Sequence, residues 1–251
     1  MIPKKIHYCW LSDTPLPDQF KECIDSWIRV MPDYELVRWD KTKFDITSNV
    51  FVEEACKMGK WAFAADYIRI YALYMEGGVY LDADVFVRKS FDDFLRYGLF
   101  TSVEYHKELV KVTKSELLLN HDGTSKIKGA RIPGIGIQAA VLGSAKGHKF
   151  LEGCLDFYEQ KKFILGNKEY FNQIIAPDIY AMVAADYGFI YKDIKQNLAH
   201  DMVVFPAEVF AGNMEQATAN SYAIHLCAGS WRDRKKEGFF KKIRSLFERD
   251  K

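Results

Sequence analysis

Short apolar runs alternate with amphipathic stretches through the first hundred residues. After Pro17 and Asp18, apolar residues recur at intervals of three and four, which predicts a helix. The same reasoning predicts strands over residues 5–10, 35–39, 79–81, 85–87 and 99–104 and helices over residues 50–58 and 61–76. Strands that alternate with helices are typical of an α/β fold in which helices flank a mostly parallel central sheet.

The pattern weakens between residues 105 and 136, where Lys, Gly, Ser and Thr dominate. A loop of this length in a compact domain is usually functional or mobile. Beyond it the pattern predicts strands over residues 137–142, 202–205 and 222–227 and helices over residues 149–160 and 177–187. We find no internal repeat and no linker, so we expect a single domain over residues 1–231.

The character of the chain changes over residues 232–251, which hold nine basic and four acidic residues. Phe239, Phe240, Ile243, Leu246 and Phe247 fall at helical spacing among the lysines. This pattern predicts a basic amphipathic helix, which either lies on an anionic membrane leaflet or packs its apolar face on the domain. A peripheral membrane contact through this tail is therefore one of two open interpretations.

The net charge of +1 conceals this tail, because residues 1–231 carry 26 basic and 30 acidic residues, or −4. A balance of this kind argues against a protein that holds nucleic acid by bulk charge, so we expect no nucleic-acid partner. Five cysteines without a Cys-x-x-Cys pair argue against a disulfide scaffold or structural zinc. No signal-peptide pattern and no membrane-spanning apolar run is found, so we expect a cytoplasmic protein, peripheral to the inner face of the membrane if the tail binds lipid.

Two charged residues interrupt the otherwise apolar helix predicted over residues 61–76, namely Asp66 and Arg69. They are three residues apart and therefore share a helix face. Buried charges are costly unless they are paired or serve a ligand. Two interpretations are open: an ion pair inside the core, or a polar fork that holds a ligand at the edge of the sheet.

Two carboxylates follow directly after the buried strand over residues 79–81, in the run Asp82-Ala83-Asp84. In an extended chain, side chains two residues apart point to the same side. The carboxyl ends of strands in α/β sheets are typical ligand sites. Adjacent carboxylates repel, and a hard divalent cation such as Mn²⁺ or Mg²⁺, shared with a phosphate, would relieve that repulsion.

His225 lies in a strand-like run, and a small turn then presents Ser230 and Trp231. A histidine here could ligate a metal or donate to a phosphate. A single histidine in a strand is, however, more often a core residue with satisfied hydrogen bonds.

These segments together resemble the glycosyltransferase family with the Asp-x-Asp sugar-binding motif. That family includes the yeast initiating α-1,6-mannosyltransferase, bacterial capsule and lipopolysaccharide glycosyltransferases and, more distantly, large glucosylating toxins. The resemblance is carried by residues 65–69 (Ala-Asp-Tyr-Ile-Arg) and 77–84, and also by residues 2–10, 144–148 and 225–231. The matching segments occur in order and extend over nearly the whole chain.

The resemblance implies a GT-A fold, which is Rossmann-like and binds a nucleotide sugar, together with a Mn²⁺ or Mg²⁺ ion. In this family Asp66 and Arg69 would hold the ribose and the donor sugar. Asp82 would contact the ribose and sugar, or the metal through water, and would take part in catalysis with Asp84. Asp84 would ligate the metal directly, and His225 would complete the metal shell near the diphosphate.

The resemblance also implies residues around the donor. Ser230 and Trp231 would close over the phosphates. Tyr8 and Trp10 would stack on or line the base, since aromatic faces at a strand end suit a uracil or guanine ring. Gln138 stands where relatives often have an asparagine facing the donor sugar, which makes it a candidate catalytic residue despite the departure from the family pattern.

The implied activity is a metal-dependent, retaining transfer of a hexose, with a UDP-hexose favoured as donor. The acceptor would be a saccharide or a lipid-linked saccharide in surface polysaccharide synthesis. A double displacement needs a carboxylate nucleophile, and the candidate carboxylates already have other roles. We therefore expect the acceptor hydroxyl to attack on the face from which the phosphate departs and to pass its proton to that phosphate.

Two alternatives are weighed against this activity. Haloacid-dehalogenase-type phosphatases also carry Asp-x-Asp after a strand, with the first Asp as nucleophile. They usually have Thr or Val two residues after the second Asp, where this chain has Phe86, and their motif sits near the N-terminus. The other alternative is a non-catalytic nucleotide-sugar-binding module, against which the intact Asp82, Asp84 and His225 argue.

Overall fold

The elements of the first hundred residues form where the apolar pattern predicts them. The computed structural model describes residues 1–166 and 169–227. Its first half contains β1 (Lys5–Cys9), α1 (Asp18–Val30), β2 (Glu35–Trp39), α2 (Val50–Lys57), α3 (Trp61–Glu76), β3 (Gly78–Leu81), β4 (Val85–Val87) and β5 (Leu99–Tyr105), with short 3₁₀ turns η1 (Ile46–Ser48) and η2 (Asp92–Phe94).

The second half departs from the expectation at several points, including strands over residues 196–198 and 210–211 where none is predicted. It contains α4 (Lys107–Thr113), η3 (Ser115–Leu118), β6 (Ile135–Ile137), β7 (Val141–Ser144), α5 (Lys149–Glu159), α6 (Ala176–Ala184), η5 (Ala185–Tyr187), β8 (Gln196–Leu198), η6 (Ala199–Asp201), β9 (Met202–Phe205), β10 (Phe210–Ala211) and β11 (Ala223–His225). The weakly patterned stretch thus includes a short helix, a 3₁₀ turn and a strand. The single strand expected over residues 137–142 is two strands, because residues 138–140 leave the ladder between β6 and β7.

The central sheet has the order β2-β1-β3-β7-β5-β9-β8, and β6 pairs with β5 off this path. Neighbours are parallel at β2–β1–β3 and at β5–β9, whereas β7 is antiparallel to both β3 and β5. The sheet is therefore mixed rather than mostly parallel. The reason is that β6 returns antiparallel along β5 and β7 continues in that direction between β5 and β3, without the helical crossover that a parallel neighbour requires.

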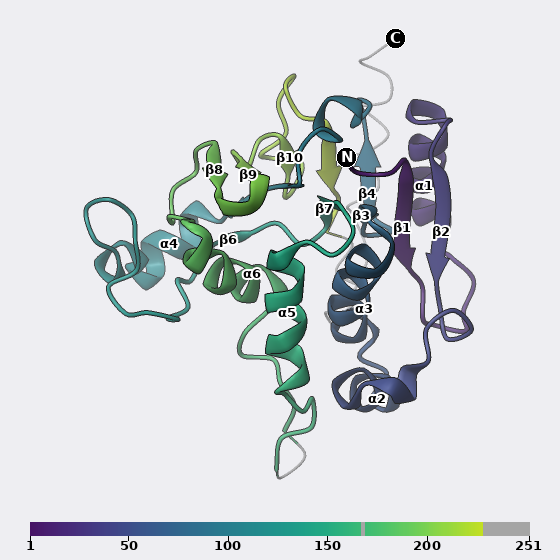
Figure 1. The fold of residues 1–251 in the computed structure, drawn as a ribbon, viewed down its shortest axis with the longest axis horizontal. Helices are drawn as coiled ribbons and strands as arrows, with labels where there is room; N and C mark the ends of the chain where they lie inside the picture. Colours follow the sequence, from purple (N-terminus) through teal and green to yellow (C-terminus); the bar gives the residue numbers. More distant parts are fainter. Residues whose placement is uncertain (167–168, 228–251) are drawn as a thin grey trace.

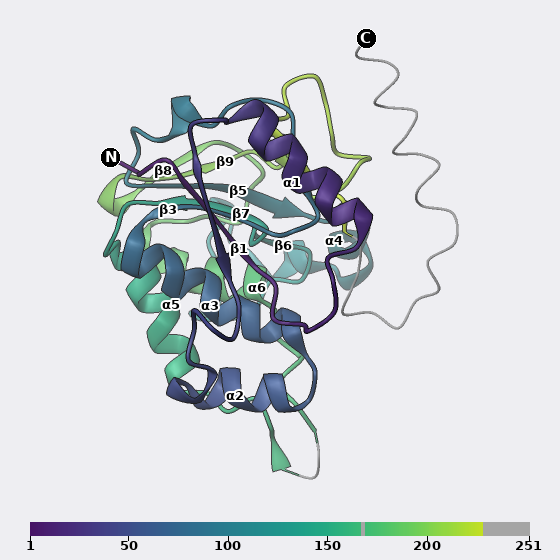
Figure 2. The same cartoon turned by 90° about the vertical axis from the view of Figure 1, so that its right-hand side faces the viewer.

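Both faces of the sheet are covered (Figures 1 and 2). Helices α2, α3, α5 and α6 pack on one face and share one apolar core with it. Helix α1 and the segments around β4 and β10 bury the other face in a second core. The indole nitrogen of Trp27 in α1 donates to the carbonyl of Val85 at 2.7 Å, which fixes α1 against the start of β4. The α/β class and the flanking helices are confirmed.

Two glycines allow α3 to return directly into β3. Gly77 has φ +66° and its N–H donates to the carbonyl of Leu73, which ends the helix. Gly78 has φ +119°, and a Cβ there would lie 2.9 Å from both the Lys5 carbonyl oxygen and His7 Nε2. Only glycine fits so close to the backbone of β1 in this conformation. The turn sets the position at which β3 delivers Asp82.

A second, three-stranded sheet has the order β10-β11-β4. In it β11 runs antiparallel to β4, with His225 opposite Val85. Since Val85 follows Asp84 in the chain, this pairing brings His225 to the Asp-x-Asp segment from a distant part of the sequence.

Three sequence-based predictions stay outside this description. Ser230, Trp231 and the predicted amphipathic helix over residues 232–251 lie beyond the described residues, and the domain boundary at 231 therefore remains a prediction. Among the helices that the structure describes, none is long and apolar enough to cross a bilayer. Among the cysteines, Cys9, Cys23, Cys56 and Cys154 are buried and Cys227 is exposed.

Candidate active site

The Asp-x-Asp segment is a turn and not an extended strand. The N–H of Asp82 donates to the carbonyl of Ala140 at 3.0 Å as the chain leaves β3. The N–H of Val85 then donates back to the carbonyl of Asp82 at 2.9 Å. The expected strand geometry is therefore wrong for these three residues. Their two carboxylates nevertheless come together, because the turn directs both toward the carboxyl edge of the sheet.

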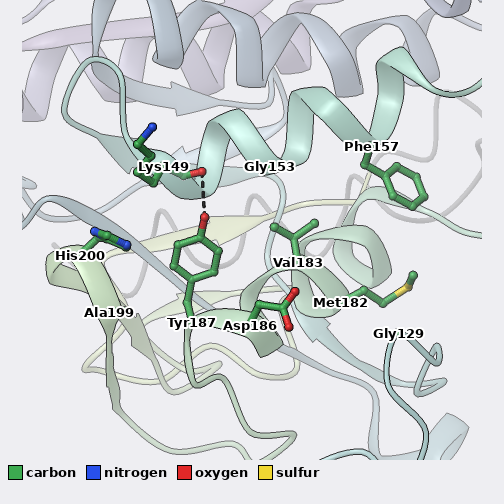
Figure 3. Close-up of a pocket in the computed structure, with 10 residues that line it drawn as sticks. All are labelled: Gly129, Lys149, Gly153, Phe157, Met182, Val183, Asp186, Tyr187, Ala199 and His200. Atoms are coloured by element: carbon green, nitrogen blue, oxygen red, sulfur yellow. Dashed lines mark hydrogen bonds between the residues drawn. The ribbon is translucent and has the colours of Figure 1, made fainter.

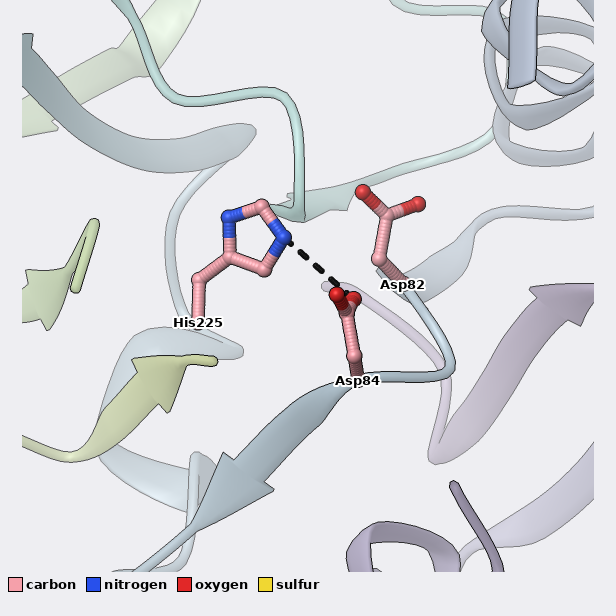
Figure 4. A group of neighbouring side chains, drawn as sticks. All are labelled: Asp82, Asp84 and His225. Atoms are coloured by element: carbon pink, nitrogen blue, oxygen red, sulfur yellow. Dashed lines mark ion pairs between the residues drawn. The ribbon is translucent and has the colours of Figure 1, made fainter. Parts of the chain in front are cut away.

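Asp82, Asp84 and His225 form one cluster at this edge (Figure 4). One ligand atom of each lies within 4.8 Å of the others, and all three side chains are partly buried. His225 Nε2 lies 3.3 Å from Asp84 Oδ1. The N–H of Leu226 donates to the carbonyl of Asp84 at 2.9 Å, which ties the end of β11 to the turn. The structure thus brings together the three residues predicted as metal ligands.

The orientation of the His225 ring is set from its other side. Its Nδ1 lies 3.6 Å from Cys227 Sγ, and that sulfur donates to the carbonyl of Gly212 at 3.0 Å. Contacts of this kind to one ring nitrogen direct the other toward a metal. Burial opposes a charge on His225, but the adjacent Asp84 carboxylate outweighs it and raises the pKa of the imidazole well above its usual range. The cluster therefore favours a positive charge beside Asp84.

Arg69 joins helix α3 to the same edge. The side chain is only 5% exposed, and its Nη2 lies 2.9 Å from Asp66 Oδ1 and 3.3 Å from Asp82 Oδ1. Its Nη1 donates to the carbonyl of Ala139 at 2.7 Å. The two interpretations of Asp66 and Arg69 are thus compatible, because the ion pair inside the helix extends to a carboxylate at the sheet edge.

Tyr80 is a site residue that the sequence reasoning missed. Its hydroxyl donates to Asp82 Oδ1 at 3.0 Å, and its fully buried ring lies 4.9 Å from the guanidinium carbon of Arg69. Its position two residues before Asp82 is the sequence signal that could have identified it.

Asp66 is affected by the same buried surroundings. Burial raises the pKa of its carboxyl group to about 7, although the charge of Arg69 acts in the opposite direction.

Gln138 is buried, and both ends of its amide contact the backbone. Its Nε2 donates to the carbonyl of Phe210 at 3.2 Å, and its Oε1 accepts from the N–H of Ala140 at 3.3 Å. These bonds hold the segment between β6 and β7, whose carbonyls accept from Arg69 and from the N–H of Asp82. The structure therefore gives Gln138 a positioning role, and a direct contact with the donor sugar stays a prediction.

Tyr8 and Trp10 lie at the end of β1, which runs parallel to β3 with His7 opposite Tyr80. Both therefore reach the sheet edge that carries Asp82. The Tyr8 ring packs edge-on to Trp27 with centroids 5.8 Å apart, and Trp10 packs edge-on to Phe20 at 5.5 Å. Both side chains keep part of their surface exposed. Their predicted contact with the base remains a prediction.

A separate hollow of about 650 Å³ lies among α5, α6, η5 and η6 (Figure 3). The Tyr187 hydroxyl donates across it to the carbonyl of Lys149 at 2.9 Å. None of the residues that line this hollow belongs to the Asp82, Asp84 and His225 cluster. We therefore assign the candidate chemistry to the sheet edge.

The chain is similar to known glycosyltransferases. Inositol phosphoceramide mannosyltransferase 3 of Schizosaccharomyces pombe is 27% identical over 154 residues, which cover 60% of this chain and 35% of that relative. The chain thus matches only about a third of the length of that curated relative.

Two solved structures share the fold. Mouse xyloside xylosyltransferase 1 in its apo form has a TM-score of 0.52 at 10% identity, with 90% of this chain and 98% of that chain covered. The galactosyltransferase LgtC, in complex with donor and acceptor sugar analogs, has a TM-score of 0.50 at 13% identity, with 96% and 94% covered.

The family model "glycosyltransferase sugar-binding region containing DXD motif" matches residues 17–100, which include α3, β3 and the turn after it. Residues 17–100, with Asp82 and Asp84 at the DXD motif, therefore match the glycosyltransferase sugar-binding region, and the chain has the GT-A fold of these two solved structures.

Proposed function

We propose that this protein transfers a hexose from a nucleotide sugar, with a UDP-hexose favoured, to a saccharide or lipid-linked saccharide, and that it retains the anomeric configuration. The observation that carries the proposal is the convergence of Asp82, Asp84 and His225 within 4.8 Å at the carboxyl edge of a GT-A sheet. The family match and the fold favour this activity over the phosphatase alternative.

The donor set of this cluster fits a divalent metal. Two carboxylates and an imidazole nitrogen suit Mn²⁺ better than Mg²⁺, which prefers oxygen ligands alone. Asp84 and His225 would hold the ion directly, and Asp82 would complete the set. The bound metal would neutralise the charge that develops on the departing diphosphate.

The chain's own residues orient the donor around that position. Arg69 is fixed by Asp66 and by the carbonyl of Ala139, so its guanidinium holds Asp82 without a large loss of side-chain entropy. The Tyr80 hydroxyl donates to the same carboxylate. These contacts fix the orientation of the Asp82 carboxylate, which would accept hydrogen bonds from hydroxyls of the ribose or the sugar.

We further propose that the acceptor hydroxyl attacks the anomeric carbon on the face from which the phosphate leaves. The bond between the anomeric carbon and the phosphate oxygen breaks as the new glycosidic bond forms, and the hydroxyl proton passes to the departing phosphate. A product with the anomeric configuration of the donor is expected by NMR. A covalent glycosyl-enzyme found by mass spectrometry would replace this route with a double displacement.

The acceptor side of the proposal draws on the relatives. The name of the fission yeast relative gives inositol phosphoceramide, a lipid, as the acceptor of that mannosyltransferase. A lipid-linked acceptor is therefore compatible with the family match, and a role in surface polysaccharide synthesis follows the sequence resemblance. A mannose donor belongs in the screen beside UDP-hexoses.

A thermal-shift screen tests the donor assignment without an acceptor. UDP-glucose, UDP-galactose, UDP-N-acetylhexosamines and GDP-mannose are compared with and without Mn²⁺. A ligand at a hundred times its Kd stabilises by about 2.7 kcal/mol, which raises the Tm of a chain of this size by about 5–10 °C. Asp84→Asn should lose the Mn²⁺-dependent shift, whereas Asp93→Asn, at an exposed carboxylate away from the cluster, should keep it. No shift with any nucleotide sugar would contradict the proposal.

A further inference from the structure

The segment that follows β5 presents an unusual number of exposed apolar side chains. Of thirteen large hydrophobic residues exposed among the described residues, five fall between residues 109 and 127. They are Leu109 (41% exposed), Val112 (77%), Leu117 (68%), Leu118 (37%) and Ile127 (63%). Concentrated apolar exposure of this kind marks an interaction surface more often than a neutral one.

Local contacts hold these side chains near one another. Leu109 and Val112 are three residues apart on α4 and share one face of that helix. Leu119 pairs with Ser125 in an isolated bridge, and the N–H of Lys126 donates to the carbonyl of Leu118 at 2.9 Å. The chain around Leu117 and Leu118 therefore lies beside that around Lys126 and Ile127.

Three lysines lie beside these apolar residues, and Glu108 is the one acidic residue of α4. Lys107, Lys111 and Lys114 line one hollow of about 400 Å³, together with Leu117, Val110, Tyr105 and Glu116. All three lysines are exposed, and within residues 1–166 and 169–227 none of the three has an ion-pair partner within 4 Å. Lys107 and Lys111 are four residues apart and lie on the side of α4 opposite Leu109 and Val112, which is the division into basic and apolar sides found in helices that lie on membrane surfaces. We call the exposed surface formed by Lys107, Leu109, Lys111, Val112, Lys114 and Leu117 the α4 face.

The α4 face lies at the edge of the sheet that holds the site. Strands β3 and β5 run in the same direction, because β7 is antiparallel to both. Asp82 follows the end of β3 and Lys107 follows the end of β5, so both emerge at the carboxyl edge. Figure 1 shows α4 and the chain after it projecting from the body of the molecule beyond β6.

We propose that the α4 face docks on the surface of an anionic phospholipid bilayer. Its apolar side chains would enter the boundary between headgroups and acyl chains, while the lysines contact lipid phosphates. A protein partner is disfavoured because lysine is depleted in the cores of protein interfaces. The inference rests on the proposed function in one respect, since docking here would present a lipid-linked acceptor to the edge that holds Asp82.

Vesicle co-sedimentation of the full chain tests this inference. Vesicles of phosphatidylglycerol and phosphatidylcholine are compared with vesicles of phosphatidylcholine alone. The triple variant Lys107→Gln, Lys111→Gln, Lys114→Gln should bind anionic vesicles about a hundredfold more weakly, from about fivefold for each lysine at the surface. Val112→Ser combined with Leu117→Ser should also weaken binding, because the charges stay but the apolar insertion is lost.

Control variants separate this surface from charge elsewhere. Lys21→Gln, Lys57→Gln, Lys162→Gln removes three exposed lysines away from α4 and should bind vesicles like the wild type. All variants keep residues 232–251. If the α4 variants bound vesicles as tightly as the wild type, the membrane contact would belong to another part of the chain, and the inference would be overturned. Equal binding to both vesicle types, or none by the wild type, would also overturn it.

Failure of the membrane inference can be distinguished from failure of the proposed function, because vesicle binding tests the first and the thermal shift with the donor tests the second. The α4 variants should keep the Mn²⁺-dependent thermal shift with the donor, because their altered side chains lie outside the Asp82, Asp84 and His225 cluster. A retained shift with lost vesicle binding supports the α4 face. An absent shift in the wild type refutes the donor assignment whatever the vesicle result.

Discussion

Replacement of Arg69 by methionine tests the charged network that joins α3 to the sheet edge. Methionine keeps most of the length and apolar volume of the side chain but removes the cation. The change leaves Asp66 and Asp82, whose side chains are 16% and 24% exposed, without their 2.9 Å and 3.3 Å partner. It also removes the donor that the carbonyl of Ala139 uses at 2.7 Å.

The magnitude follows from these contacts. Breaking a buried ion pair by removing one partner costs about 3–5 kcal/mol. Residual exposure of the two carboxylates lets water relieve part of this cost, so we expect the lower end, about 3 kcal/mol. For a chain of 251 residues this lowers the Tm by about 6–12 °C. Arg69→Lys should lie between methionine and the wild type, since one ammonium group cannot serve both carboxylates and the carbonyl.

Urea denaturation followed by circular dichroism measures the free energy of unfolding. Lys21→Met is the matched control, because Lys21 forms an exposed ion pair with Asp18 at 2.8 Å and the same spacing of three residues. Exposed pairs contribute at most about 1 kcal/mol. If Arg69→Met and Lys21→Met were equally stable, the buried network would not hold the site together as we describe.

Two further predictions concern the turn between α3 and β3. Gly78→Ala should lower the free energy of unfolding by more than about 3 kcal/mol, because a positive φ is combined with a Cβ 2.9 Å from the Lys5 carbonyl oxygen. Gly129→Ala, with φ +72° and nothing within 4 Å of a Cβ, should cost only about 1–2 kcal/mol, and equal losses would refute the steric argument. His7 is held neutral, with Nε2–H donating to Gly77 O at 2.7 Å and Nδ1 accepting from Trp39 Nε1–H at 3.0 Å, and burial lowers its pKa below 6.5. Below pH 6.5 the unfolded chain binds a proton at His7 that the folded chain does not bind. The free energy of unfolding, measured by urea titration, should therefore decrease as the pH is lowered below 6.5, and it should decrease less steeply in His7→Asn. An unchanged slope in the variant would rule out His7 as a source.

The apolar pattern predicts the elements of the fold better than their directions. Helix α3 and strands β1 to β5 form where periodicity places them, since each buries a face that the pattern marks. The reversed direction of β7 depends on which strands it separates, and no local signal encodes that pairing. Helix α4 escaped prediction because only Val110 of its seven residues is buried, so it has almost no apolar periodicity.

In the candidate site, too, the sequence predicts the residues better than their spatial arrangement. Residue type and family resemblance indicate Asp82, Asp84 and His225, and the structure brings them together through the pairing of β11 with β4. The turn that joins the carboxylates, and the carbonyl of Ala139 that fixes Arg69, are backbone features without a side-chain signal. Tyr80 is not distinguished from the apolar run before Asp82, because its ring packs in the core and only its hydroxyl contacts a site residue, Asp82.

Direct measurement of bound Mn²⁺ by electron paramagnetic resonance, with and without UDP, tests the central claim that Asp82, Asp84 and His225 form the metal centre of the donor site. Wild-type protein should bind one Mn²⁺ per chain, and UDP should tighten that binding. Asp84→Asn should weaken it by at least about tenfold, since an amide replaces a charged ligand. Wild-type protein that binds no Mn²⁺ in the presence of UDP, or an Asp84→Asn variant that binds it equally well, would contradict the account.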